Sequence, residues 1–172
     1  MAVRIPGFHN TKKRFDAFVM AVEQDTMNRA EAVKEEIGFV MDRKEDASVL
    51  VDLLKAGKLP LRVTHNDTKF NNVMIDEKTG EGVCVIDLDT VMPGLSLYDF
   101  GDTVRTGTNT AAEDEKDLSK VRMELRLFES FTHGFMDSAR DFLTPLEIEL
   151  LPFGAKIMTF ECGMRFLTDY LN

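Results

Sequence analysis

Hydrophobic positions in the first 60 residues recur with the spacing of amphipathic helices. One apolar helical face is formed by Phe15, Phe18, Val19 and Val22. Asn10 or Thr11 precedes this run as a candidate N-cap. Two further helices are predicted over 28–41 and 47–56, the second ended by Gly57. The N-terminal third of the chain is therefore predicted to be helical.

The hydrophobic period changes after residue 60. Short β-branched runs over 61–64, 72–76 and 82–87 are separated by polar or glycine-containing segments, which is typical of strands. The last two runs flank "EKTGE", so they predict a β-hairpin. After Pro93 and Gly94 the pattern returns to helix.

The C-terminal part of the chain predicts two long helices. Apolar residues keep a three-to-four spacing over 118–142, which predicts about seven helical turns. Thr144, Pro145 and Glu147 form a capping-box start with proline at the first helical position. The helix that follows is apolar on most sides, so we expect it to be largely buried. The polar segment 106–117 is the best candidate for a mobile loop.

Length, composition and charge exclude several classes of protein. A chain of 172 residues corresponds to about one domain, and 44% hydrophobic with 30% charged residues is typical of globular proteins. The net charge of −9 argues against coating nucleic acid or a polybasic membrane surface. No apolar run approaches the roughly 20 residues that span a bilayer, and the first ten residues lack a signal-peptide core. We expect a soluble, cytoplasmic protein without nucleic-acid or membrane partners.

The cysteines and histidines support this interpretation. Cys84 and Cys162 lie in apolar contexts that are typical of buried, reduced thiols. The three histidines, His9, His65 and His133, are scattered along the chain and lack the ligand spacing of a zinc site. The sequence therefore predicts no zinc centre.

The most informative segment is "HNDTKFNN" at 65–72, which fits the H-x-D-x-K-x-x-N spacing of a kinase catalytic loop. Phosphoryl transfer asks the protein mostly for positioning and charge neutralisation. Asp67 would accept or orient the substrate hydroxyl proton, and Lys69 would reach the transferring phosphate. The side-chain oxygen of Asn72 would hold Mg²⁺. In the alternative interpretation Asp67 is a turn former and His65 a packed core residue, which leaves their joint spacing unexplained.

The predicted hairpin adds a second metal ligand. Asn72 and Asp87 are equidistant from the turn at 79–80. Antiparallel pairing would place their Cα atoms side by side, about 5 Å apart, as two ligands of one Mg²⁺ require. Asp67, Asp87 and Asp89 would together form an acidic cluster that holds the metal. Alternatively, Asp87 only ends a strand.

An Asp-Phe-Gly triplet occurs in "YDFG" at 98–101 and resembles the metal-binding triplet of protein kinases. It lies beyond the hairpin, at the predicted start of a helix, whereas Asp87 follows directly from the hairpin strand. We therefore assign the metal to Asp87. Asp99 is interpreted as a structural carboxylate that supports the catalytic loop, together with His65.

"VTHNDTKFNNVMID" followed by "VCVIDLDTVMPGLSLYDFGD" resembles the aminoglycoside phosphotransferase and choline kinase superfamily, and within it the N-acetylhexosamine 1-kinases. The resemblance extends over essentially the whole chain, but only to the C-terminal lobe of such enzymes. It implies an α+β, mainly α fold over 1–172: the C-terminal lobe of a protein-kinase-like fold, with helices packed around a small β-hairpin carrying the catalytic loop. It also implies that ATP phosphorylates the anomeric hydroxyl of GlcNAc or GalNAc.

The resemblance also implies residue roles. Asp67 would be the catalytic base, Asn72 and Asp87 the Mg²⁺ ligands, and Lys69 would lie near the γ-phosphate of ATP. The last helix would line the sugar pocket, with Arg165 reaching substrate hydroxyls; alternatively, Arg165 is a surface or ion-paired residue. Asp89, which stands where many kinases have glycine, would contact substrate or brace its loop.

The chain departs from this family at its beginning. Such kinases need a phosphate-covering glycine-rich loop, a strand lysine and a helix glutamate, and the 64 residues before His65 supply none of them. We expect the N-terminal nucleotide-binding lobe to be absent and the chain to have little activity alone. It could self-associate through surfaces that the missing lobe would cover. Two alternatives stay open: a kinase of another small alcohol (an aminoglycoside, choline or homoserine), and a non-catalytic remnant or binding module.

Overall fold

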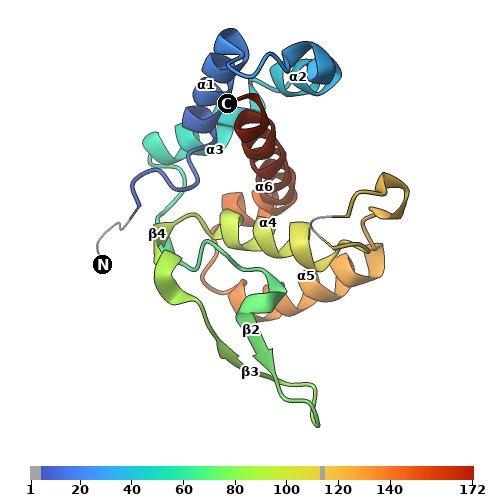
Figure 1. Cartoon of the computed structure of the whole chain (residues 1–172). Helices are drawn as coiled ribbons and strands as arrows, with labels where there is room; N and C mark the ends of the chain where they lie inside the picture. The colour runs from blue at the N-terminus through green and yellow to red at the C-terminus, as the bar shows by residue number, and fades with distance from the viewer. Residues whose placement is uncertain (1–4, 113–114) are drawn as a thin grey trace.

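A computed structural model describes residues 5–112 and 115–172. The fold is α+β and mainly helical, as predicted, with two small antiparallel sheets (Figure 1). The helices are α1 (Thr11–Gln24), α2 (Lys34–Met41), α3 (Asp46–Lys55), α4 (Ser96–Gly107), α5 (Leu125–Ala139) and α6 (Pro145–Leu171). The strands are β1 (Arg62–Thr64), β2 (Val73–Ile75), β3 (Gly82–Val85) and β4 (Met92–Gly94). Short 3₁₀ helices are η1 (Ala30–Val33), η2 (Phe70–Asn72), η3 (Leu88–Thr90) and η4 (Leu118–Lys120).

Several predicted helix ends are confirmed. The Asn10 side chain caps α1 by accepting the backbone amide of Lys13. The capping box of α6 forms between Thr144 and Glu147. After α3 the chain turns at Gly57, whose φ of 67° lies in the left-handed region that glycine adopts without steric cost. Residues within a few positions of each helix end, acting through a side chain or through backbone conformation, are therefore sufficient to determine where these helices begin or end.

Two predicted helices are shorter than expected. The stretch over 28–41 begins as η1 and becomes α-helical only in α2. The helix predicted over 118–142 is α-helical only in α5, because the chain before it pairs with another segment. The backbone amide of Thr110 donates to the carbonyl of Arg122, and that of Glu124 donates to the carbonyl of Thr108. The predicted loop over 106–117 begins later than expected, since α4 runs to Gly107, and Glu113 and Asp114 lie outside the described residues.

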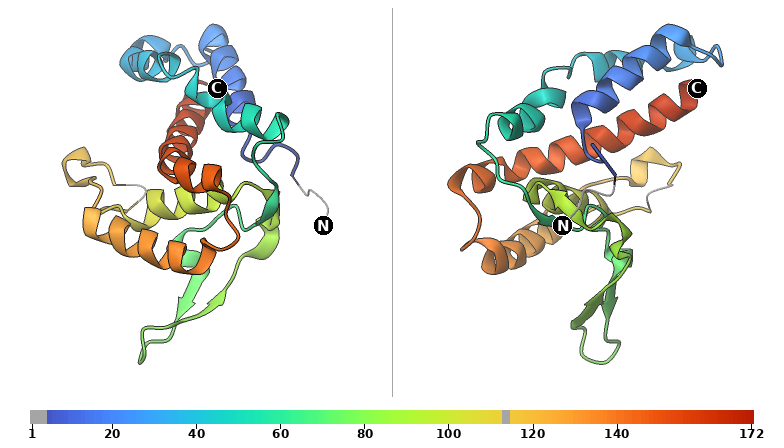
Figure 2. Two further views of the ribbon diagram at one scale, coloured as in Figure 1. Left: turned by 180° about the vertical axis from the view of Figure 1, so that it is seen from behind. Right: turned by 90° about the vertical axis from the view of Figure 1, so that its left-hand side faces the viewer.

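The core is built around α6, which packs against α1 on one side and α4 on the other (Figure 2). At the crossing of α4 and α6, a Cβ atom at Gly101 would lie 2.3 Å from the Gly154 carbonyl oxygen. Only glycine permits this close approach. The prediction that α6 is largely buried is wrong for one of its faces, where Phe166 is 55% exposed. No helix in the described ranges is long and apolar enough to cross a membrane.

The two sheets differ in their surroundings. Strand β4, which sequence patterning did not predict, pairs with β1 so that Gly94 lies opposite Arg62. The hairpin of β2 and β3 instead projects away from the helices (Figures 1 and 2). Cys84 on β3 is exposed, so the expectation of a buried thiol is wrong there, whereas Cys162 is half-buried; both thiols are free. Among the residues that the structure describes, no helix packs on the hairpin to cover Cys84.

Candidate active site

Three of the predicted site residues lie together on the segment between β1 and β2. The Asn72 amide nitrogen donates to the carboxylate of Asp67 at 3.0 Å and to its backbone oxygen at 2.8 Å. The Lys69 ammonium pairs with the same carboxylate oxygen of Asp67 at 3.0 Å. Asn72 is buried in η2, whereas Asp67 and Lys69 are half-buried. The loop therefore presents one carboxylate held between an amide and a cation.

Asp99, at the beginning of α4, lies beneath this loop. Its two carboxylate oxygens accept the backbone amides of His65 and Asn66, each at 2.8 Å. Burial raises the pKa of the Asp99 carboxyl, although both amides favour its ionised form. Asn66 is held with φ at 65°, a conformation that asparagine tolerates better than most residues. Asp99 thus supports the loop through the backbone amides of His65 and Asn66.

His65 connects the loop to the hairpin. One ring nitrogen, Nε2, lies 2.9 Å from the carbonyl oxygen of Ile86, and the backbone amide of Asp67 donates to Nδ1 at 3.3 Å. A carbonyl oxygen can only accept, so Nε2 carries the proton and Nδ1 is free to accept. This network assigns a neutral His65 whose two nitrogens have different partners.

The predicted register of the hairpin is wrong. The hairpin closes between Asp76 and Glu81, so its turn is centred earlier than expected, and a bulge between Met74 and Ile75 shifts the pairing by one residue. The backbone amide of Ile86 consequently donates to the Asn72 carbonyl.

Asp87 follows one position beyond the residue that pairs with Asn72. The chain turns there, at a φ of 58°. Asp87 therefore does not lie directly opposite Asn72.

The acidic cluster expected at Asp67, Asp87 and Asp89 does not form. In residues 5–112 and 115–172, no three His, Cys, Asp or Glu side chains are placed to hold a metal ion. Asp87 and Asp89 are both exposed, at the start of and within η3. The register shift and the turn at Asp87 prevent the three carboxylates from meeting at one point. Two oxygen donors are left as possible ligands of a cation. They are the side-chain oxygen of Asn72 and the carboxylate of Asp87, and both are hard ligands of the kind Mg²⁺ prefers.

Neither of the two predicted substrate contacts has a hydrogen bond or ion pair to the loop among the described residues, and their roles stay predictions. Arg165 is exposed on α6 and lies over the ring of the adjacent Phe166, with its guanidinium carbon 5.0 Å from the ring centroid. It lines neither of the cavities described below. Asp89 makes no hydrogen bond or ion pair with the described part of the chain. Its predicted role as a loop brace is filled instead by the next residue, Thr90, whose hydroxyl donates to the His65 carbonyl.

A cavity of about 480 Å³ adjoins the loop. Lys69 and Phe70 form its loop side, Arg105 comes from α4, and Thr159 and Cys162 come from α6. Its volume lies within the range of small-molecule sites, roughly 300 to 1,000 Å³. Because Lys69 also pairs with Asp67, the cavity lies within one side chain of the predicted catalytic carboxylate. Helix α6 therefore lines a cavity next to the loop, on a face that does not carry Arg165. That this cavity binds a sugar stays a prediction.

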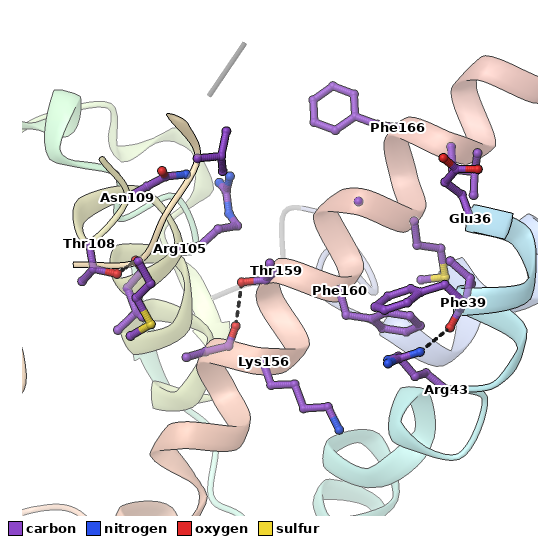
Figure 3. A pocket seen from close by; sticks show the side chains of 18 of the residues that line it. Glu36, Phe39, Arg43, Arg105, Thr108, Asn109, Lys156, Thr159, Phe160 and Phe166 are labelled. Carbon is purple, nitrogen blue, oxygen red and sulfur yellow. Dashed lines mark hydrogen bonds between the residues drawn. The ribbon is translucent and has the colours of Figure 1, made fainter. Parts of the chain in front are cut away.

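A larger groove of about 1260 Å³ runs along α6. In Figure 3, Phe160 on α6 faces Phe39 of α2 and Arg43 in the turn after it, while Arg105 and Asn109 form the opposite wall. Its lining is mainly apolar, and the described catalytic and metal-binding candidates are not among the lining residues. The predicted catalytic residues thus do not line the larger groove, although it adjoins the smaller cavity. The two share Arg105, Asn109, Thr159, Gly163 and Phe166.

Sequence reasoning missed the threonines that hold the loop against α4. The Thr103 hydroxyl donates to the Thr68 carbonyl at 3.0 Å, and the Thr68 hydroxyl donates to the Asp99 carbonyl at 2.7 Å. Thr103 lies one helical turn after Asp99, so the i, i+4 spacing from a predicted bracing residue was an available signal. It also missed His9, which no local pattern connects to residue 66.

The sequence comparison agrees with this geometry. Residues 6–127 match the family model of the phosphotransferase enzyme family. This range contains the catalytic loop, the hairpin and Asp99 with the rest of α4, and it covers well over half of the 172 residues. The chain belongs to the phosphotransferase enzyme family.

Proposed function

We propose that this chain is the catalytic lobe of an ATP-dependent sugar kinase, most specifically an N-acetylhexosamine 1-kinase acting in the cytoplasm. The observation that carries the proposal is the joint placement of Asp67, Lys69 and Asn72 on one loop that Asp99 holds from below. The alternative interpretation, in which Asp67 only forms a turn and His65 only packs in the core, does not explain why these three side chains lie together. The sugar specificity rests on the resemblance of the motifs.

Asp67 would act as the general base. Its carboxylate accepts the proton of the acceptor hydroxyl as the oxygen–phosphorus bond forms and the bond from the γ-phosphorus to the leaving ADP oxygen breaks. Asn72 and Lys69 both contact the same oxygen of this carboxylate, at 3.0 Å each. These contacts orient the carboxylate and leave its second oxygen for the substrate. Lys69 would also neutralise charge on the transferring phosphate.

Asn72 and Asp87 would hold Mg²⁺. The bound cation would supply charge neutralisation for the nucleotide phosphates, which is the usual role of Mg²⁺ in phosphoryl transfer. The Asn72 amide nitrogen is used by Asp67, so its oxygen is the atom that remains for a cation. The Asp87 carboxylate makes no hydrogen bond or ion pair within the described ranges, so it would be a second ligand.

The cavity beside Lys69 would bind the acceptor. Its volume of about 480 Å³ lies in the lower half of the usual range for small-molecule sites, which favours one sugar ring over a multi-ring aminoglycoside. Polar groups of Thr106, Asn109 and Thr159 line it together with the ring of Phe166. Such a lining suits a hydroxylated ring that also carries an apolar edge or acetyl group.

Activity should require more than these 172 residues. The segment before the catalytic loop forms α1, α2 and α3, whereas the family's ATP site needs a lobe with a phosphate-covering loop above it. We therefore propose that the chain works with a nucleotide-binding lobe. A coupled assay for ADP release should detect little turnover of GlcNAc and ATP by the chain alone.

The decisive experiment uses the protein together with an N-terminal nucleotide-binding lobe. GlcNAc and GalNAc should be phosphorylated at the anomeric oxygen, identified by ³¹P NMR, and Asp67→Asn should abolish turnover while circular dichroism stays unchanged. Asp137→Asn, on the exposed side of α5, is the matched control and should retain activity. Preference for an aminoglycoside, choline or homoserine would replace the sugar assignment. Full activity of Asp67→Asn, or no phosphorylation of any acceptor, would overturn the kinase proposal in favour of a non-catalytic module.

Metal binding can be tested without turnover. Mn²⁺ with ATP, followed by water-proton relaxation, should bind the chain, and Asp87→Asn should weaken that binding about tenfold. Asp76→Asn is the matched control, because its carboxylate only accepts the amides of Lys78 and Thr79 in the hairpin turn. Equal effects of the two variants would contradict the assignment of Asp87.

A further inference from the structure

A buried polar cluster lies where the N-terminal end of α1 meets α6. Glu161 on α6 is 4% exposed, and its carboxylate accepts the hydroxyl of Thr11 at 2.5 Å. The ring of His9 and the guanidinium of Arg14 contact the other carboxylate oxygen, at 2.9 and 3.1 Å. A buried carboxylate needs such partners, because an unpaired buried charge is costly. Glu161 therefore ties the first residues of the chain to the central helix.

The His9 ring has an acceptor at each nitrogen. Nδ1 lies 2.9 Å from the Glu161 carboxylate, and Nε2 lies 3.0 Å from the carbonyl oxygen of Asn66. A neutral imidazole carries one N–H, and neither a carboxylate nor a backbone carbonyl can donate. Both contacts are hydrogen bonds only if His9 is an imidazolium cation. The charge-assisted bonds that result are stronger than neutral ones.

The surroundings of the ring hold it in place. Its side chain is 10% exposed, and the rings of Phe8 and Tyr98 lie with centroids 4.7 and 5.0 Å from its own. The charged or titratable groups that face it are Glu161 from α6, Arg14 from α1, and Tyr98 and Asp99 from α4; Asp99 also interacts electrostatically with His65 of the loop. Burial together with Glu161 raises the pKa of Tyr98, so that hydroxyl stays neutral beside the imidazolium.

The Asn66 carbonyl belongs to the peptide group that immediately precedes Asp67. The N–H of the same peptide group donates to Nδ1 of His65 at 3.3 Å. The two histidines thus hold one peptide plane from both sides, His9 as a charged donor and His65 as a neutral acceptor. Rotation of this plane would move the Asp67 side chain. The other groups of Asn66 are held elsewhere, its backbone amide by Asp99 and its side chain by Thr64 and Thr90. The carbonyl is the group of Asn66 that His9 holds.

We propose that His9 is a positioning residue for Asp67, acting as an imidazolium through the Asn66 carbonyl, and that the loop loses this support when His9 deprotonates. The role of Asp67 in this statement rests on the proposed function. The geometric part, which is that His9 controls the peptide group before Asp67, does not. It can be tested on the chain itself.

The test uses NMR on the 172-residue chain. Long-range ¹H–¹⁵N spectra should show both ring nitrogens of His9 protonated while the loop amides stay protected, in contrast to His65, which should show one protonated and one bare nitrogen. His9→Gln can serve only one of the two acceptors, so the Asp67 amide should shift and its hydrogen exchange should become about tenfold faster. His133→Gln, on the exposed side of α5, is the matched control and should change neither.

A pH titration of the wild-type chain covers the case in which His9→Gln does not fold. The amide shift of Asp67 should follow the titration of the His9 ring signals. Amide shifts that follow the His65 or His133 rings instead, or a neutral His9 ring while the loop amides stay protected, would overturn the proposal. Active Asp67→Asn would refute the proposed function but leave these signals unaffected, so the two failures are distinguishable.

Discussion

The Asp99 carboxylate accepts the backbone amide of Asn66 at 2.8 Å and thereby joins the beginning of α4 to the predicted catalytic loop, 33 residues earlier in the chain. The same carboxylate accepts the amide of His65 with its other oxygen. An aspartate is suited to this place because both of its oxygens accept. The contact gives the aspartate of the Asp-Phe-Gly triplet a structural partner in the loop.

Asp99→Asn should destabilise the protein by about 2 kcal/mol. The new amide group presents a donor to one backbone N–H, which then stays unsatisfied in a half-buried site. Urea denaturation measures the change, and Asp137→Asn is the surface control. We further expect the affinity for Mn²⁺ with ATP to be unchanged. A loss of that affinity with unchanged stability would show instead that Asp99 is a metal ligand.

The ion pair of Glu147 with Arg62 should make stability depend on pH in the acid range. Burial alone disfavours a charged Glu147, but hydrogen bonds from Arg62, Thr144 and Ser96 outweigh it and lower its pKa from 4.5 to about 2. The folded-state pKa is thus below the unfolded one, so the stabilisation is present above about pH 4.5 and is lost as the pH falls towards 2. A shift of this size corresponds to about 3 kcal/mol.

Urea denaturation of the wild type and Glu147→Gln at a series of pH values measures this dependence. The difference in unfolding free energy should be largest at neutral pH and should shrink in acid. Glu31→Gln removes a fully exposed pair with Lys34 and should have nearly no effect at any pH. A wild-type advantage that is constant from pH 7 to pH 3 would contradict the assigned ionisation of Glu147.

Gly101→Ala should destabilise the crossing of α4 and α6. The added methyl would lie 2.3 Å from the Gly154 carbonyl oxygen, and backbone cannot yield as a flexible side chain does. We expect a loss of about 3 kcal/mol in unfolding free energy. Gly134→Ala, inside α5 with nothing within 4 Å of the new methyl, should instead be neutral or stabilising by up to about 1 kcal/mol. Similar effects of the two substitutions would refute the close approach of the helices.

We also propose that the projecting hairpin supports association with a second copy of the chain. Strands β2 and β3 form a two-stranded sheet whose outer edges are unpaired among the described residues. Exposed apolar side chains lie along it: Met74, Ile75, Val83, Val85 and Ile86. Open apolar edges are templates for pairing with another chain, so sedimentation velocity should show a dimer or larger species at micromolar concentrations.

A pair of variants distinguishes association through the hairpin from non-specific association through other exposed apolar residues. Val83→Lys places a charge on β3 and should weaken association about tenfold. Leu118→Lys changes a residue that is 80% exposed but lies in η4, outside the hairpin, and should leave association unchanged. A monomer at every concentration, or equal effects of both variants, would exclude the hairpin as the interface.

Local sequence determined a large part of this protein. Helix ends at Asn10, Thr144 and Gly57 depend on side chains or backbone freedom within a few residues. The spacing of Asp67, Lys69 and Asn72 brings them together because they lie on one short loop, where distance along the chain limits distance in space. Family membership follows from the same short-range motifs. For these features no knowledge of the remaining chain is needed.

Other features were decided only by the tertiary structure. The position of Asp87 depends on the bulge between Met74 and Ile75 and on the turn at Asp87 itself. The alternation of hydrophobic and polar residues does not predict either of them. The sequence predicted that Asp99 supports the loop, but it did not show that the backbone amides of His65 and Asn66 are its partners. The partners of Glu147 and His9 across the fold lie more than 50 residues away, and only the packing of the chain brings them together. His9 illustrates the reason most clearly. Its proximity to Asn66 arises only because α1 packs on α6, and that packing results from the whole hydrophobic core rather than from any motif.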